Sequence, residues 1–356
     1  MRALKQVAIW ENVTAELFQK EIAPLAEPAI LKGLVGSWPI IQAVNNDNSS
    51  ENKELLAYLS DMYVGGDVRI AEIAKGQKAE FFYNKTLTGF NFERKVTSYT
   101  KFINQLTENA TLIKTHSGLT NGAIAIQSAP IKDYFPPFTD KHPMHLFDVE
   151  ACHSNKNITS EPRFWLGNKS TVIAHYDDAE NIACVVAGKR KVTLFPPEQI
   201  ANLYGGPLEF TPAGAPVSMV NLAEPDFEKF PKFKQALNYA LVAELEPGDA
   251  LYIPTLWWHH VEALSEINML VNYWSGGSIM NNQTPVPMDA MLLAIMTIRE
   301  LPEAQRKAWK SFFDYQVFDH KPQQNQHIPE QIKGVLASLT DEKRLAIKQW
   351  LLSQLH

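Results

Sequence analysis

Two segments far apart in the chain place metal-binding side chains at the ends of predicted β-strands. Residues 173–177 read IAHYD and offer a histidine and an aspartate, and residues 253–261 read IPTLWWHHV and offer two adjacent histidines. The stretches at 164–167, 181–195 and 250–254 that flank them are apolar and are bounded by Gly or Pro, which is typical of strands. We therefore expect a fold in which these strands bring the two segments to one place.

Strand alternation selects one of the two adjacent histidines. His259 has the same parity as Val261, whereas His260 has the same parity as Glu262. Successive side chains of a strand point to opposite faces, so an apolar interior takes His259 together with Val261 and leaves His260 outside or packed laterally. The alternative is that both are ordinary half-buried imidazoles beside a tryptophan pair.

His175, Asp177 and His259 together supply two imidazoles and one carboxylate. This ligand set is the facial triad of non-haem Fe(II) oxygenases, which leaves coordination positions open for other ligands. The H-x-D triplet alone is a weak signal, because short patterns recur by chance and an Asp in a surface turn often accepts a backbone hydrogen bond. The strands predicted on both sides favour the metal site, because they would hold it rigidly.

The motifs occur in an order that resembles the JmjC or cupin-8 family of Fe(II)- and 2-oxoglutarate-dependent oxygenases. They are P-x-x-x-K-G, H-Y-D, N-x-x-x-x-x-x-G-K-R with L-F-P-P, P-G-D-x-L-Y-I-P-x-x-W-W-H-H-V and N-Y-W, between Pro28 and Trp274. Within the family, the chain looks most like the asparaginyl hydroxylase that modifies hypoxia-inducible factor. The resemblance implies a mainly β fold with flanking helices, a double-stranded β-helix or jelly-roll barrel. It also implies Fe(II) as the metal and 2-oxoglutarate as cosubstrate.

Arg190 is the predicted partner of the distal carboxylate of 2-oxoglutarate. It alternates in step with Val192 and Leu194, so it should point into the barrel. A buried carboxylate needs a cation, and Arg can bind one through two parallel hydrogen bonds. The alternative is a strand-end Arg in a surface ion pair.

The resemblance adds four residues to the predicted cosubstrate pocket. The family's pocket asparagines match Asn181 and Asn272, its aromatic wall matches Trp274, and Gln127 lies on the strand that carries a further pocket residue in the family. Each asparagine could also be a satisfied core amide, so their place in the pocket is a prediction.

Four polar positions of the asparaginyl hydroxylase are missing from this chain. Its Tyr and Thr beside the cosubstrate are replaced by Ala125 and Val172, and its Arg-Gln pair beside the target is replaced by Pro216 and Val217. The latter two lie in a long Pro-rich insertion at 205–241, which we expect to border the substrate. We therefore expect a different target.

Composition limits the partners and the compartment. The formal net charge is -6 and the pI is about 6.0, so the sequence shows no basic footprint of a nucleic-acid partner. Cys152 and Cys184 form no disulfide framework, which favours the reducing cytoplasm. No apolar run reaches the length of a transmembrane helix, so we expect no membrane partner.

The chain changes character near residue 280. Residues 1–280 are expected to form the barrel with its N-terminal helices and strands, and residues 281–356 a helical region. Its predicted helices span 288–300, 303–313, 329–339 and 341–355. Thr340 should cap the last of them. Their apolar stripes could cover the barrel or seal a homodimer, and we favour the homodimer.

Two classes of function fit these patterns. The one that we favour is a 2-oxoglutarate-dependent dioxygenase that hydroxylates an unactivated C–H bond, with a protein or peptide side chain as substrate. The same chemistry could act on a tRNA base or a small metabolite. The other class is a non-catalytic cupin-like protein that binds a metal or ligand, which the missing Tyr and Thr leave open.

Overall fold

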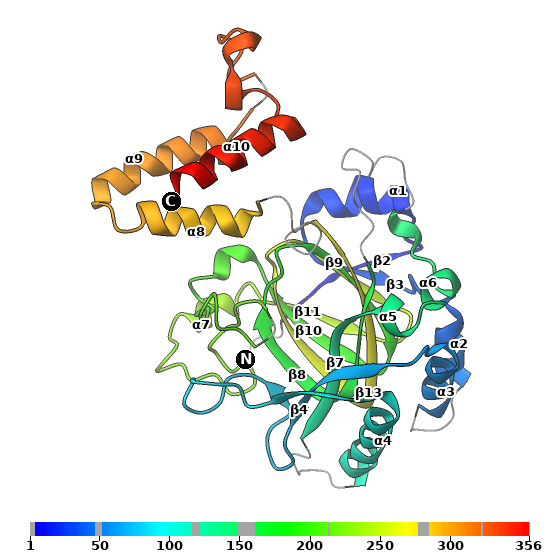
Figure 1. Ribbon diagram of the computed structural model, residues 1–356. Helices are drawn as coiled ribbons and strands as arrows, with labels where there is room; N and C mark the ends of the chain where they lie inside the picture. The colour runs from blue at the N-terminus through cyan, green and yellow to red at the C-terminus, as the bar shows by residue number, and fades with distance from the viewer. Residues whose placement is uncertain are drawn as a thin grey trace. The chain divides into compact units, whose positions relative to one another are not determined.

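The computed structural model describes residues 4–46, 52–115, 122–147, 161–212, 214–276, 285–321 and 323–355. The chain divides into two compact units, Met1–Met280 and Asn281–His356 (Figure 1). Among the described residues, no helix has both the length and the apolar character needed to cross a membrane.

The larger unit is built around a 13-stranded sheet in which most neighbouring strands run antiparallel. The strands are β1 (Lys5–Gln6), β2 (Ala8–Glu11), β3 (Ala29–Lys32), β4 (Asp67–Ile73), β5 (Glu80–Phe81), β6 (Glu93–Ser98), β7 (Ala123–Pro130), β8 (Arg163–His175), β9 (Glu180–Ala187), β10 (Arg190–Phe195), β11 (Leu241–Leu245), β12 (Ala250–Ile253) and β13 (Trp258–Ser275). The main path is β2-β3-β12-β9-β13-β8-β7-β4-β6, and β10 pairs with both β11 and β13. The predicted jelly-roll barrel with flanking helices is confirmed.

Two long strands join the layers of the barrel. β13 pairs with β10 over its first residues, Trp258 to Ala263, and with β9 over its last residues, Met269 to Ser275. β8 runs antiparallel to β13 along most of its length, with a register shift between Ala263 and Ile267. Such shifts bend a strand, so β13 contributes its first half to one layer and its second half to the other.

Alternate residues of the strands separate an outer core from an inner core. The helices of this unit are α1 (Ala15–Leu17), α2 (Pro39–Asn46), α3 (Lys53–Met62), α4 (Tyr99–Thr115), α5 (Ile131–Tyr134), α6 (Phe138–Lys141) and α7 (Phe233–Ala236). α2, α3 and α4 lie along the outside of the sheet (Figure 1), and their apolar side chains share a cluster with Cys184 and Val186 of β9. The intervening residues, Ala183 and Val185, belong to the inner cluster, so β9 is buried on both faces.

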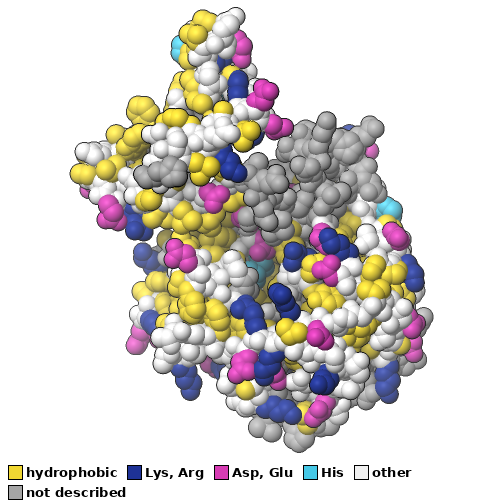
Figure 2. Space-filling view, viewed as in Figure 1, with side chains coloured by type: hydrophobic (Ala, Val, Ile, Leu, Met, Phe, Trp, Pro, Cys, Tyr) yellow, Lys and Arg dark blue, Asp and Glu magenta, His cyan; other side chains and the backbone are white. Residues whose placement is uncertain are grey.

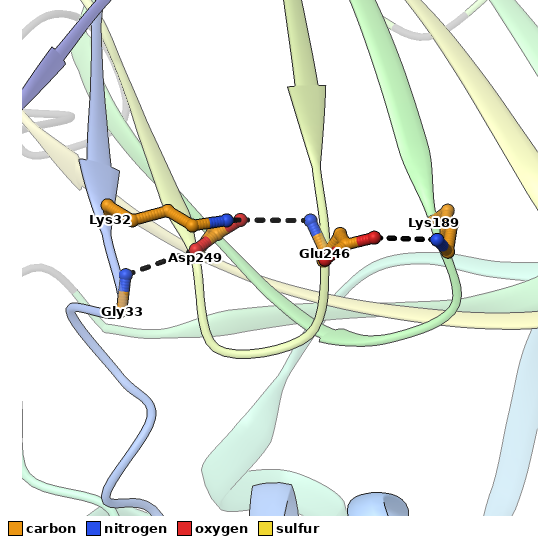
Figure 3. A network of polar contacts seen from close by, with 5 residues as sticks. All are labelled: Lys32, Gly33, Lys189, Glu246 and Asp249. Atoms are coloured by element: carbon orange, nitrogen blue, oxygen red, sulfur yellow. Dashed lines mark hydrogen bonds and ion pairs between the residues drawn. The ribbon is translucent and has the colours of Figure 1, made fainter.

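Asp249 ties together two turns that are far apart in the chain (Figure 3). Its buried carboxylate accepts hydrogen bonds from the backbone N–H of Gly33 (3.1 Å), the backbone N–H of Glu246 (3.0 Å) and the Lys32 ammonium (2.8 Å). The adjacent Gly248 has φ of +99°, and a Cβ there would lie 3.3 Å from neighbouring backbone, so the position favours glycine. The P-x-x-x-K-G and P-G-D motifs are therefore one structural lock that holds β3 beside β12.

We expect Asp249→Ala to lower the free energy of unfolding by about 2–4 kcal/mol, because it removes a buried acceptor shared by three donors. The measurement is urea unfolding followed by tryptophan fluorescence. Glu246→Ala is the control, because it removes only the exposed ion pair with Lys189 (2.6 Å) and should change stability by less than about 1 kcal/mol. Equal losses in the two variants would contradict the lock.

The C-terminal unit is helical. It contains α8 (Pro287–Ile298), α9 (Glu303–Phe313) and α10 (Asp341–Gln354). The Thr340 hydroxyl accepts a backbone hydrogen bond from the first turn of α10, so the predicted cap is confirmed. The helix predicted at 329–339 is wrong. Two short 3-10 turns, Glu330–Ile332 and Gly334–Leu336, occupy this segment, because Gly334 has φ of +54° and interrupts helical geometry.

Candidate metal centre

Two histidines lie directly opposite each other on neighbouring strands. His175 is the last residue of β8 and His259 the second of β13, and the two are register partners. Their ring centroids are 4.2 Å apart. Opposed residues of an antiparallel pair project from the same face, so strand pairing alone brings the two imidazoles together.

The backbone fixes which nitrogen of each ring is available to a ligand. Nδ1 of His175 lies 2.8 Å from the carbonyl oxygen of Ile173, and Nδ1 of His259 lies 3.0 Å from that of Trp257. A carbonyl only accepts hydrogen bonds, so Nδ1 carries the proton in both rings. Nε2 of each ring therefore keeps its lone pair for a metal ion.

Asp177 completes the metal-binding group. Its Oδ2 lies 3.7 Å from Nε2 of His259, and the ligand atoms of His175, Asp177 and His259 all lie within 4.8 Å of one another. Trp274 donates from Nε1 to Oδ2 of Asp177 (3.1 Å) and so orients the carboxylate. His259 and Trp274 belong to opposite ends of β13, yet both lie beside Asp177. The bend in β13 therefore brings its two ends to the same site.

The two adjacent histidines, His259 and His260, are both buried, and burial lowers the pKa of both. They differ in the direction in which their side chains point. Desolvation, with a smaller effect of His175, holds the pKa of His259 well below its usual range, which keeps the imidazole neutral and able to bind a metal. Burial also lowers the pKa of His260, to about 4. His260 is the register partner of Thr193 and belongs to no metal-binding group among the described residues, so the structure groups His259 with the other ligands.

Arg190 is a buried cation on the inner side of β10. It is 7% exposed, its side chain has no hydrogen bond or ion pair within the part of the chain that the structure describes, and its Nε is buried without an acceptor there. Burial lowers the pKa of Arg190 to about 10, so the guanidinium remains charged at neutral pH. A buried charge without a counter-ion is costly, and a carboxylate in the barrel would supply one. The residues present therefore fit an anionic cosubstrate.

The other predicted pocket residues differ in their surroundings. Asn272 donates from Nδ2 to Oδ1 of Asn181 (2.7 Å), while its own Oδ1 is buried with no donor among the described residues. Asn181 is the register partner of Trp274, so these three side chains lie near the metal-binding group. Gln127 lies half-buried at a register shift of β7, and its side chain makes no hydrogen bond to another described residue. The cosubstrate contacts of all four remain predictions.

Comparison with known proteins identifies the family. The sequence matches the cupin-like domain family over residues 14–276. The chain belongs to this family. Its described residues also place His175, Asp177 and His259 together as a group that could hold a metal ion.

The curated relatives of this cupin-like protein differ in how much of the chain they cover. It is 32% identical over 139 residues to lysine-specific demethylase JMJ31 of Arabidopsis thaliana, an alignment that spans 39% of this chain and 25% of that relative. It is 31% identical over 116 residues to HSPB1-associated protein 1 of Homo sapiens, spanning 32% of this chain and 23% of the relative. It is 26% identical over 318 residues to tRNA wybutosine-synthesizing protein 5 of Gallus gallus, an alignment that spans 85% of this chain and 91% of that relative. The specific likeness to the asparaginyl hydroxylase stays a prediction.

The cupin-like barrel has apolar surroundings at two positions where the asparaginyl hydroxylase has polar groups. Ala125 is buried in a cluster with Ala71 and Ile73, and Val172 is the register partner of Val261. Neither position therefore offers a hydroxyl group to the inside of the barrel.

The insertion after β10 is fixed to the strand that carries His175. Val217 forms an antiparallel bridge with His175, and the Ser218 N–H donates to the carbonyl of Ala174 (2.7 Å). The Tyr83 hydroxyl donates to the carbonyl of Phe210, which anchors the insertion to a second part of the barrel. The insertion thus lies beside the metal-binding group. Tyr83 was not predicted, because only its long-range contact reveals its role.

Metal binding should distinguish His175, a predicted ligand, from His260, which is not one. We expect His175→Ala to abolish stoichiometric Fe(II) binding, because it leaves only two ligands, and His260→Ala to retain most of it. Equilibrium dialysis of anaerobic protein against Fe(II), followed by metal analysis, measures the stoichiometry, and circular dichroism checks the fold. Equal iron loss in both variants would show that His260 takes part in the site.

Proposed function

We propose that this protein is an Fe(II)- and 2-oxoglutarate-dependent dioxygenase that hydroxylates a C–H bond of a protein or peptide side chain. The observation that carries the proposal is the combination, in one barrel, of a complete metal triad with Arg190, a buried guanidinium that has no counter-ion among the residues the structure describes. When bound, Fe(II) would supply the activation of O₂ that an unactivated C–H bond requires.

The protein's own residues have distinct tasks in this proposal. His175, Asp177 and His259 would hold the metal, with two backbone carbonyls and the Trp274 indole fixing their orientation. Arg190 would bind the distal carboxylate of 2-oxoglutarate and so set the direction in which its 2-oxo acid end approaches the metal. The apolar inner cluster would exclude water from the reaction.

A peptide substrate is supported by the charge of the chain and by the insertion. The net charge of -6 disfavours a polyanion, and the rim position opposite His175 is the apolar Val217. A tRNA substrate is the second candidate, because the relative named for wybutosine synthesis in tRNA aligns over 85% of this chain and 91% of its own length. Succinate formation with peptide, tRNA and metabolite pools separates the candidates. Absence of any turnover would favour the non-catalytic binding module.

Arg190→Ala tests the cosubstrate role directly. We expect the affinity for 2-oxoglutarate to fall about 100-fold or more, because a buried charge pair is lost, while metal binding is retained. The measurement is calorimetric titration of the Mn(II)-loaded protein under anaerobic conditions.

Lys191→Ala is the matched control for Arg190→Ala. Lys191 is the next residue of β10, and its ammonium pairs with Glu262 at 2.9 Å on the other side of the strand. The control should bind 2-oxoglutarate like the wild type. Metal loss with unchanged 2-oxoglutarate affinity in Arg190→Ala would overturn the assigned role.

We also propose that the C-terminal unit forms a homodimer. Its three helices contain no buried residue, and large apolar side chains such as Phe318 (73% exposed) and Trp350 (62% exposed) lie on its surface. Figure 2 shows hydrophobic side chains over much of this unit. Exposed apolar area of this extent is characteristic of an association surface, and a second copy is the partner that is always present.

The double variant Phe318→Glu with Trp350→Glu should convert a dimer into a monomer, because it places charges in an apolar interface. Light scattering coupled to size-exclusion chromatography measures the mass. Val96→Glu changes an equally exposed apolar residue of the barrel and should leave the mass unchanged. A wild-type protein that is already monomeric would contradict the proposal.

We assign the activity to the cytoplasm. The chain has two cysteines, and Cys184 is a buried free thiol in the structure. A protein without a disulfide framework fits a reducing compartment.

A further inference from the structure

Trp165 lies on the inner face of the barrel, on β8. It is the register partner of Leu270 on β13, and its indole packs against the inner cluster that contains Leu270, Val192 and Leu245. Its neighbours along β8, Phe164 and Leu166, point to the outer core and are fully buried. Trp165 is only half-buried, so the inward face of the strand borders more open space than the outward face does.

The indole nitrogen of Trp165 is a donor without an acceptor. Its Nε1 is shielded from solvent and has no hydrogen bond within the described chain. Leaving a buried donor unpaired is unfavourable, so such groups in native proteins usually serve a ligand or bound water. By contrast, the indole nitrogens of Trp38, Trp257 and Trp274 all donate to protein acceptors.

Trp165 lies near position 125, where the barrel lacks a hydroxyl group. Ala125 and Gly167 are register partners on β7 and β8, and Gly167 is two residues from Trp165 on the same face. A Cβ on Gly167 would lie 2.7 Å from that of Ala125, so the backbones of these two strands approach closely here and offer no polar side chain. The Tyr and Thr hydroxyls of the asparaginyl hydroxylase are replaced here by Ala125 and Val172. Arg190 lies on β10 as a buried cation whose side chain has no counter-ion among the described residues.

We propose that Trp165 and Arg190 together bind the distal carboxylate of the 2-oxo acid cosubstrate, with the Trp165 Nε1–H replacing the missing hydroxyl donors. This inference rests on the proposed function. The guanidinium supplies the charge, and the indole supplies a single directed donor from the other layer of the barrel. A carboxylate has several acceptor sites, so it satisfies both groups at once. Trp165 is thus a specificity residue for a cosubstrate that carries a distal carboxylate.

The test compares two 2-oxo acids that differ only at the distal end. Wild type and Trp165→Phe, both loaded with Mn(II), are titrated calorimetrically with 2-oxoglutarate and with 2-oxopentanoate, which lacks the distal carboxylate. Phenylalanine keeps most of the ring volume and removes the N–H. We expect Trp165→Phe to weaken 2-oxoglutarate binding about tenfold or more and to leave 2-oxopentanoate binding unchanged.

Trp38→Phe is the matched control, because its indole donates to the carbonyl of Pro143 (3.0 Å) in the outer core. It should lower the urea midpoint and leave both affinities unchanged. Trp165→Phe should not lower the midpoint of the cosubstrate-free protein, because it removes an unpaired donor.

Two results would overturn the inference alone. These are unchanged 2-oxoglutarate affinity in Trp165→Phe, or equal weakening of both oxo acids, which would indicate a packing role. A wild-type protein that binds Mn(II) and neither oxo acid would instead overturn the proposed function together with this inference.

Discussion

The register between β8 and β13 is the constraint on which the rest of the site depends. It sets His175 opposite His259, and the bend in β13 returns Trp274 to the same place, where its indole orients Asp177. A shift of one residue in this pairing would send His259 to the outer side and bring His260 inward. The register is held because both faces of these strands are buried, so any slip would expose apolar side chains and bury polar ones.

The second constraint is electrostatic. The inner face is apolar, yet it contains the charged Arg190, the Oδ1 of Asn272 and the Nε1 of Trp165, and the last two have no partner in the described part of the chain. Each of these groups costs stability in the absence of a partner, and together they present donors and one acceptor inside a single barrel. The free energy gained from burying the two apolar cores, and from contacts such as those of Asp249, offsets the unfavourable burial of these groups. The donors of Arg190 and Trp165 are what a preorganised site for an anion requires.

Much of the metal site could be predicted from the sequence, because it follows from local alternation. Parity along 259–262 selected His259, and parity along 190–194 placed Arg190 inside. Contacts between distant segments could not be predicted. The Asp249 lock, the bridge between Val217 and His175, and the contact of Tyr83 with the insertion all depend on the finished fold. Alternation also puts Trp165 inward, but only the structure shows that its Nε1 has no acceptor among the described residues. The failed helix at 329–339 has a local cause in the backbone conformation of Gly334.

The central claim is that the triad holds a metal with open positions for a 2-oxo acid. The most direct test is anaerobic titration of the Fe(II)-loaded wild-type protein with 2-oxoglutarate, followed in the visible spectrum. Chelation of the metal through the 2-oxo acid end should produce a weak charge-transfer band that saturates with one equivalent of cosubstrate. Protein that binds Fe(II) stoichiometrically and shows no such band would contradict the account and favour a binding module without oxygenase activity.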